Sequence, residues 1–317
     1  MVEYDCDNTL EHTPAHVCTE EEHTEEKNYY KKDGGFAGIT HAVSTLATVL
    51  IVAAFFPSVF ALAYNFPQAH DNTSYTMSFP MIFLCVVCTV GSCMLPDLDN
   101  TKSSAESSLG FVGSILSEVF RAIAVFIQTA LRTKRDDATP DPHRGFWHTS
   151  MGALLLATPV YLIGSNAKAG DGVDFFNGTL IFTVFVLSYL SICALLHKEF
   201  KKKKSKSILF QLFPYIFAAL VVAIMYVTQG VEIFSYAFPV AASIFFGMMS
   251  HVFGDCHTTS GAPIFAPFTY FTRKKVWWTT RFFSISSGGE FEKNILVKLY
   301  SLAAVIGAFG LVYNYMQ

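Results

Sequence analysis

Residues 231–268 read VEIFSYAFPVAASIFFGMMSHVFGDCHTTSGAPIFAPF, an apolar run of membrane-span length that ends in a polar motif. The motif places His251 and Asp255 four residues apart, so on a helix the imidazole and the carboxylate lie on one face, one turn apart. Two side chains placed in this way can share a divalent metal ion. Gly261 and two prolines then end the helix and turn the chain back. A single HxxxD motif is weak evidence for a metal site. The prediction becomes strong only if other ligand-type residues of the chain reach the same membrane face.

The composition is that of an integral membrane protein. Hydrophobic residues make up 52% of the 317 residues, and charged residues make up only 15%. Soluble domains average about 25% charged residues, so the chain is too apolar for an ordinary soluble fold. Several apolar windows match the roughly 20 residues that a helix needs to cross a hydrocarbon core. We therefore predict an all-α fold with about seven transmembrane helices.

Seven apolar runs are predicted to cross the membrane, within a single membrane domain that covers residues 39–317. Pro57 is expected to kink the first run. The runs are residues 39–64, 79–95, 151–163, 179–196, 208–227, 231–250 and 295–313. Residues 1–38 hold ten acidic residues and almost no aliphatic side chains, so they cannot bury a core and are predicted to form a disordered acidic tail.

Residues 109–131 are also apolar, but they differ from the seven runs. Glu118, Arg121 and Gln128 interrupt the apolar pattern, and three cations follow it directly. A helix with an apolar face and a charged face is typical of the membrane interface. We therefore predict that this segment is an amphipathic helix that lies in the interface and does not cross.

The orientation follows from where the candidate ligands and the cations fall. If residues 109–131 do not cross, seven spans place seven ligand-type residues on one side of the membrane: His41, Asp97, Asp99, His143, His148, His251 and Asp255. Of the 22 Lys and Arg residues, all except Lys168 fall on that side. The positive-inside rule makes this face cytoplasmic. The N-terminus is then cytoplasmic as well, and the C-terminus lies on the opposite side.

This set of imidazoles and carboxylates predicts a divalent metal site, with zinc as the expected metal. One catalytic zinc ion takes about three protein ligands, so the larger set suits one or two ions, with a carboxylate such as Asp97 or Asp255 as the bridge. Such a site activates water near neutral pH and stabilises charge on a phosphate ester. Arg144 could pair with a phosphate oxygen or bind lipid headgroups. Glu290 could complete the ligand shell or act as an acid or base.

Some of these motifs also have simpler explanations. Residues 96–99, PDLD, suit a polar stop after a helix, and His257 suits a polar loop residue. Cys85 and Cys88 are spaced like a redox pair, but they lie inside an apolar run. A free thiol in such a run behaves as a small hydrophobe, so we do not predict a redox function.

The order of the motifs resembles the YdjM-type family of membrane-bound metal-dependent hydrolases. The matching segments are Thr40-His41, PDLD at 96–99, HRGFWHTS at 143–150, HVFGDCHTTSGAP at 251–263 and Gly288-Gly289-Glu290. They extend over almost the whole chain after residue 38. The chain differs from the family pattern at Asn100, where a His is common, at Trp147, where a Thr is usual, and in its added acidic tail.

The resemblance implies a hydrolase at the inner membrane surface. It also implies metal or catalytic roles for the matching positions: His41, Asp97, Asp99, His143, His148, His251, Asp255 and Glu290.

The level of the candidate site in the membrane favours a lipid substrate. All candidate ligands lie at helix ends, at headgroup level, whereas a transporter binds its solute near the middle of the membrane. We therefore expect hydrolysis of a phosphoester such as a phospholipid or a polyprenyl phosphate, with membrane lipid as the partner and no nucleic acid. A catalytically silent scaffold with a structural metal is the alternative, and a divalent-cation transporter is a less favoured one. The sequence does not indicate an oligomeric state.

Overall fold

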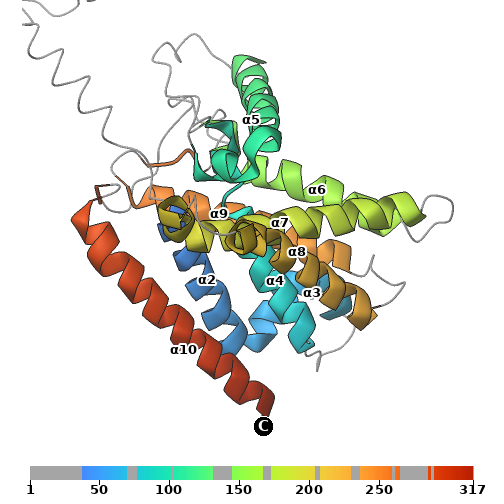
Figure 1. The fold of residues 1–317 in the computed structure, drawn as a ribbon. Helices are drawn as coiled ribbons and strands as arrows, with labels where there is room; N and C mark the ends of the chain where they lie inside the picture. The colour runs from blue at the N-terminus through green and yellow to red at the C-terminus, as the bar shows by residue number, and fades with distance from the viewer. Residues whose placement is uncertain are drawn as a thin grey trace, which may run out of the picture. The chain divides into compact units, whose positions relative to one another are not determined.

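The computed structural model describes residues 38–69, 77–100, 103–130, 145–166, 173–203, 208–229, 236–258, 261–264, 285–286 and 289–316. Nearly all of these residues are helical, which confirms the predicted all-α membrane fold (Figure 1). The chain divides into two units, residues 1–34 and residues 35–317, and every helix described below belongs to the second unit. The predicted acidic tail lies outside the described residues except for Gly38.

The helices of the second unit follow the chain in a simple order. They are α2 Gly38–Phe55, α3 Pro57–Ala69, α4 Phe79–Ser92, α5 Ser104–Ala130, α6 Ser150–Asn166, α7 Val173–Lys203, α8 Ile208–Gln229, α9 Ala237–Cys256 and α10 Val297–Met316. Three short segments flank them: the 3-10 turns η1 Pro96–Asp99 and η3 Phe146–His148, and the π-turn η7 Glu292–Leu296. Pro57 divides the first apolar run into α2 and α3, as its missing N–H and fixed φ predict.

Among the described residues, seven helical stretches are long and apolar enough to cross a membrane. They are Gly38–Phe55, Phe79–Asp99, Ser104–Ile127, Asn177–Leu196, Gln211–Thr228, Ala237–Cys256 and Glu292–Met316. The number of candidate spans agrees with the prediction, but two of the helices differ from those that were predicted to cross or not to cross. Ser104–Ile127 belongs to the set although an interfacial helix was predicted there, and the predicted span at 151–163 is a shorter apolar helix. Length and composition alone cannot assign these two helices.

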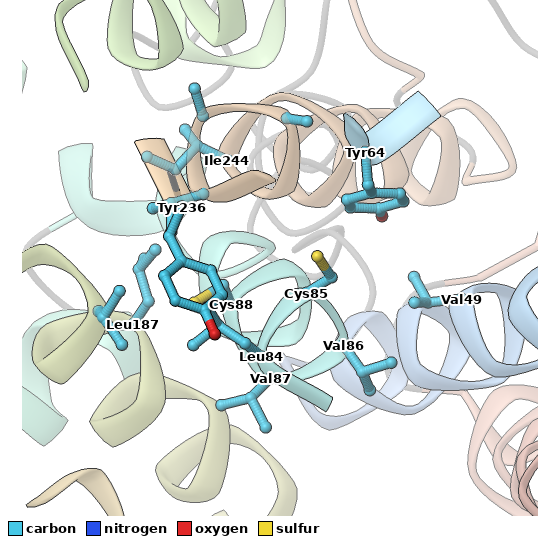
Figure 2. Close-up of a cluster of buried hydrophobic side chains, with 14 of the residues drawn as sticks. Val49, Tyr64, Leu84, Cys85, Val86, Val87, Cys88, Leu187, Tyr236 and Ile244 are labelled. Atoms are coloured by element: carbon cyan, nitrogen blue, oxygen red, sulfur yellow. The ribbon is translucent and has the colours of Figure 1, made fainter. Parts of the chain in front are cut away.

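The core of the bundle is built around α4, which packs against α2, α7, α8 and α9. The thiols of Cys85 and Cys88 lie inside this core as free, buried side chains, as predicted. Figure 2 shows them among Leu187 of α7, Tyr236, which directly precedes α9, and Ile244 of α9. Around these two cysteines, α4 therefore packs against α7 and α9 through apolar side chains.

Two glycines let the neighbouring backbones approach α4 closely. A Cβ atom on Gly91 would lie 1.9 Å from the carbonyl oxygen of Leu187 in α7. A Cβ atom on Gly247 in α9 would lie 2.3 Å from the carbonyl oxygen of Thr89. Lipid provides no hydrophobic force that drives helices together, so close packing at small residues is a main source of helix association in membranes. The two glycines therefore set the spacing of α7 and α9 from α4.

Helix α5 presents three faces after a kink at Gly110, where φ is 57° and ψ is −132°. One face, which includes Ser117 and Ala124, is buried against the bundle. A second face exposes the apolar side chains of Phe111, Ile115, Val119 and Phe126. The third face is polar and carries an exposed ion pair, in which Arg121 Nη1 lies 3.7 Å from Glu118 Oε1. A helix that touches protein, lipid and water along separate stripes suits the membrane interface.

Two hydrogen bonds fasten α5 to the rest of the bundle. Trp147 Nε1 in η3 donates to the carbonyl oxygen of Phe120 at 2.7 Å, and the two aromatic rings lie with centroids 4.6 Å apart. The hydroxyl of Tyr189 in α7 donates to the carbonyl oxygen of Ser108, also at 2.7 Å. The position of α5 is therefore tied to η3, which carries His148.

Helix α10 packs along α2 (Figure 1). A Cβ atom on Gly307 would lie 2.8 Å from the carbonyl carbon of Leu50, so the two backbones are close at mid-helix. Near the C-terminal end of α10, Asn314 Nδ2 donates to the carbonyl oxygen of Ala54 at 2.6 Å. The contact between α2 and α10 therefore extends to the C-terminal turn of α2, at the opposite end of that helix from His41.

Candidate metal centre

Five ligand-type side chains from four separate segments meet at one end of the bundle. His41 lies in the first turn of α2, Asp97 in η1, His148 at the end of η3, and His251 and Asp255 in the last two turns of α9. Four of them are at most 1% exposed, whereas the side chain of Asp97 is 16% exposed. Asp97 is therefore the most exposed of the five side chains.

A proline and two threonine hydrogen bonds fix the conformation at the ends of these segments. Pro96 cannot continue the hydrogen-bond ladder of α4, so the chain turns into η1 and presents Asp97. Thr149 directly follows His148 and caps α6, because its Oγ1 accepts the N–H of Gly152 at 3.0 Å. At the end of α9, Thr258 Oγ1 donates to the carbonyl oxygen of Asp255 at 2.7 Å.

One further contact draws the end of α9 toward η3. The backbone N–H of Ser150 donates to the carbonyl oxygen of Ile264 at 3.2 Å. Ser150 opens α6 two residues after His148, and Ile264 follows the end of α9. The loop after HxxxD therefore packs against the start of α6 and brings His148 and His251 together.

Asp255 lies at the centre of the group. Its Oδ1 lies 3.4 Å from His41 Nε2, and its Oδ2 lies 3.6 Å from both His148 Nε2 and His251 Nε2. On the other side, Asp97 Oδ1 lies 3.5 Å from His251 Nε2 and 3.8 Å from His148 Nε2. Asp97 Oδ1 and Asp255 Oδ2 thus each lie within 3.8 Å of both His148 Nε2 and His251 Nε2, and His41 faces the second oxygen of Asp255.

These separations fit a shared metal ion better than charged hydrogen bonds. A charge-assisted N–H···O bond is about 2.7–2.9 Å long, which is shorter than any of the five distances. Tetrahedral zinc ligands with bonds of about 2.0–2.1 Å lie about 3.3 Å from one another. Among the described residues, two sets of three side chains each bring one donor atom per residue within 4.8 Å of the others in the set. The sets are His41, His251 and Asp255, and Asp97, His148 and His251. Nitrogen and oxygen donors in this arrangement suit zinc.

The ring of His251 is oriented by the backbone of α4. Its Nδ1 lies 2.7 Å from the carbonyl oxygen of Cys93, and since a carbonyl only accepts hydrogen bonds, Nδ1 carries the proton. The lone pair of His251 is then on Nε2, which faces Asp97 and Asp255. The ring of His41 stacks on it with centroids 3.8 Å apart. A backbone carbonyl behind a metal-binding histidine fixes its tautomer and its direction.

The donor atoms have the capacity for one ion or two. Nε2 of His251 has a single lone pair and can bind only one ion, whereas the two oxygens of Asp255 can each bind one. One ion would be held by the group of Asp97, His148 and His251. A second would be held by His41 and Asp255, whose Oδ2 also lies close to His148 and His251.

The other predicted site residues lie elsewhere. Asp99 is buried in η1 but belongs to neither donor group, and Glu290 is exposed at the residue after Gly289. His257 also belongs to neither group, and its Nδ1 lies 2.7 Å from the carbonyl oxygen of Phe253. His143 and Arg144 lie outside the described residues. The structure therefore gathers five of the seven predicted metal ligands and gives no position for His143.

The sequence reasoning missed Glu292, the first residue of the π-turn η7. Glu292 is fully buried, and its Oε1 accepts a hydrogen bond of 2.5 Å from Thr40 Oγ1, beside His41. Glu290, which the Gly-Gly-Glu pattern had singled out, lies two residues earlier and is exposed, so Glu292 is the buried carboxylate of the two. The usable signal was an acidic residue at the start of an apolar span, which is costly in a membrane without a partner.

Comparison with protein families gives a match that covers most of the chain. The model described as YdjM inner membrane protein matches residues 36–197 and 207–316, and these ranges contain all five gathered ligands and Glu292. No curated protein and no solved structure matches the chain significantly.

Proposed function

The chain belongs to the YdjM inner membrane protein family. Because its buried histidines and aspartates could hold a metal ion, we propose that the protein is a membrane-embedded, metal-dependent hydrolase. We propose that the reaction takes place at headgroup level on the cytoplasmic side, on a phosphoester such as a phospholipid or a polyprenyl phosphate. The observation that carries the proposal is that Asp97 and Asp255 each place a carboxylate oxygen within 3.8 Å of both His148 Nε2 and His251 Nε2 at the helix ends.

The residues around this centre would have different roles in the reaction. When bound, a divalent ion supplies Lewis-acid chemistry, since it activates water near neutral pH and stabilises negative charge on a phosphoryl oxygen. His148, His251 and Asp255 hold the donor atoms in a buried setting, and the more exposed Asp97 marks the side at which substrate enters. Arg144, four residues before His148, is proposed to pair with a phosphate oxygen.

The proposed orientation requires that α5 remain on one side of the membrane. Asp97 precedes α5 and His148 follows it, yet Asp97 Oδ1 and His148 Nε2 lie 3.8 Å apart. If α5 crossed, residues 131–144 would have to return through the hydrocarbon core with seven charged side chains. Each charge costs about 2.5–3.5 kcal/mol at the bilayer centre. These costs and the three faces of α5 support an interfacial helix.

Cysteine labelling tests this placement of α5. Ser107 and Thr129 are exposed near the two ends of α5. In a variant with Cys6 and Cys18 replaced by Ser, we expect Ser107→Cys and Thr129→Cys to react with a membrane-impermeant maleimide from the same, cytoplasmic side. Lys168→Cys is the control and is expected to react only from the opposite side. Labelling of the two ends of α5 from opposite sides would show that α5 crosses.

Hydrolysis is tested with purified protein in lipid vesicles that contain, in turn, a phospholipid, a polyprenyl phosphate and a soluble phosphoester. We expect release of the hydrolysed headgroup or phosphate from a lipid substrate, a fall of at least about 100-fold after metal removal by a chelator, and recovery on addition of zinc. Release from the soluble ester alone would contradict the lipid assignment. A folded, zinc-loaded protein that hydrolyses none of the three would favour the silent scaffold.

A further inference from the structure

We propose that Glu292 is a positioning residue of the metal centre, which acts through Thr40 to hold His41 in place. The proposal concerns a carboxylate outside the donor groups and rests on the metal centre of the proposed function. Its basis is the buried hydrogen bond from Thr40 Oγ1 to Glu292 Oε1, between residues 252 positions apart in the chain.

Burial makes Glu292 an unusual residue for a purely structural role. Its exposed fraction is 0%, and that of Thr40 is 1%. A carboxylate removed from water loses hydration that only good hydrogen bonds or nearby positive charge can replace. The N-terminal end of α2 provides part of that replacement, because the N–H groups and the dipole of a helix start attract negative charge. Glu292 therefore stabilises the first turn of α2 and is itself stabilised by it.

The same turn carries a candidate metal ligand. His41 is the fourth residue of α2, directly after Thr40, and its Nε2 lies 3.4 Å from Asp255 Oδ1. The first turn of a helix is normally the part that opens most easily, because its N–H groups have no intrahelical partners. A hydrogen bond that holds Thr40 restricts the rotation and fraying of this turn. The direction of His41 toward Asp255 then depends on Glu292.

The local backbone conformation at Glu292 supports a role as a positioning residue. Glu292 opens a π-turn, and such turns often occur at functional sites. The side chains before and after it, Phe291 and Lys293, are exposed. A second hydrogen bond, from Asn314 Nδ2 to the carbonyl oxygen of Ala54, joins α10 to α2 near the other end of the pair. The two bonds fasten the same helices, but only the one at Glu292 lies beside a ligand.

Zinc affinity separates positioning from simple packing. Loss of a partner that orients a ligand costs about 10- to 100-fold in metal affinity. We expect Thr40→Val, which keeps the side-chain volume but removes the donor, to raise the zinc Kd about 10-fold or more, measured by competition with a chromophoric chelator. Glu292→Gln, which keeps an acceptor without charge, is expected to raise it less. Thr40→Ser restores the hydroxyl and is expected to remain within about threefold of the wild type.

Asn314→Ala is the matched control, because it removes the hydrogen bond near the other end of the same helix pair. It is expected to lower the melting temperature of the protein without changing the zinc Kd. The double variant Thr40→Val with Glu292→Gln is expected to bind zinc no more weakly than Thr40→Val alone, since both changes break one interaction.

Wild-type zinc affinity in both Thr40→Val and Glu292→Gln would overturn the role of Glu292 and leave the metal centre intact. If Thr40→Val does not fold, Glu292→Gln decides alone, and an unchanged Kd overturns the proposal. Equal weakening by Asn314→Ala would also overturn it, since the effect would then be packing. A wild-type protein that binds no divalent metal would overturn both this proposal and the proposed function.

Discussion

Asp255→Asn is expected to abolish hydrolysis, with a fall of about 1000-fold or more, and to remove at least half of the bound metal. The substitution keeps the volume of the side chain but removes its charge and one of its two oxygens. Asp255 Oδ1 faces His41 and Oδ2 faces both His148 and His251, so a single change alters the surroundings of all three gathered imidazoles. Metal content by elemental analysis and turnover of the lipid substrate are the measurements.

The matched control for Asp255→Asn is Glu118→Gln, which removes one negative charge from an exposed position on α5. An exposed ion pair contributes about 0–1 kcal/mol to stability, so this variant is expected to retain both metal and activity. The activity of the Asp255→Asn protein, compared with that of Glu118→Gln, also distinguishes an enzyme from a catalytically silent scaffold. An Asp255→Asn protein that folds, enters the membrane and still hydrolyses the substrate would show that the chemistry does not occur at this centre.

Gly247→Ala is expected to damage the site without altering any ligand. The added methyl group would lie 2.3 Å from the carbonyl oxygen of Thr89 and 3.0 Å from the backbone nitrogen of Cys93, so α9 must move away from α4. Gly247 lies one turn before His251, whose Nδ1 is bound to the carbonyl oxygen of Cys93. Overpacking of this kind costs about 1–3 kcal/mol, and we expect a lower melting temperature together with zinc binding at least about 10-fold weaker.

Gly178→Ala is the control, since it makes the same chemical change in α7 at a position where a Cβ atom would meet nothing within 4 Å. It is expected to leave the melting temperature and the zinc Kd unchanged. If Gly247→Ala binds zinc as tightly as Gly178→Ala, the spacing of α9 and α4 does not control the site.

Much of the architecture could be predicted because it depends on local composition. Apolar runs identified the helices, and Pro57 and Pro96 identified two of the places where they break. The HxxxD spacing required a helix through Asp255, and α9 indeed continues to Cys256. Whether α5 or α6 crosses the membrane was harder to predict, because both are apolar helices and their location depends on contacts with other segments.

The sequence by itself determined the helical membrane fold, the residue types of the candidate metal centre and the helix ends at which they occur. Only the tertiary structure decided between neighbouring carboxylates: Asp97 joins a donor group and Asp99 does not, while Glu292 is buried and Glu290 is exposed. Residues two apart lie about 240° apart around a 3-10 turn and about 200° apart around an α-helix, so the members of each pair point in different directions. Which member faces the centre depends on how each helix end is rotated against its neighbours, and packing between distant segments sets that rotation.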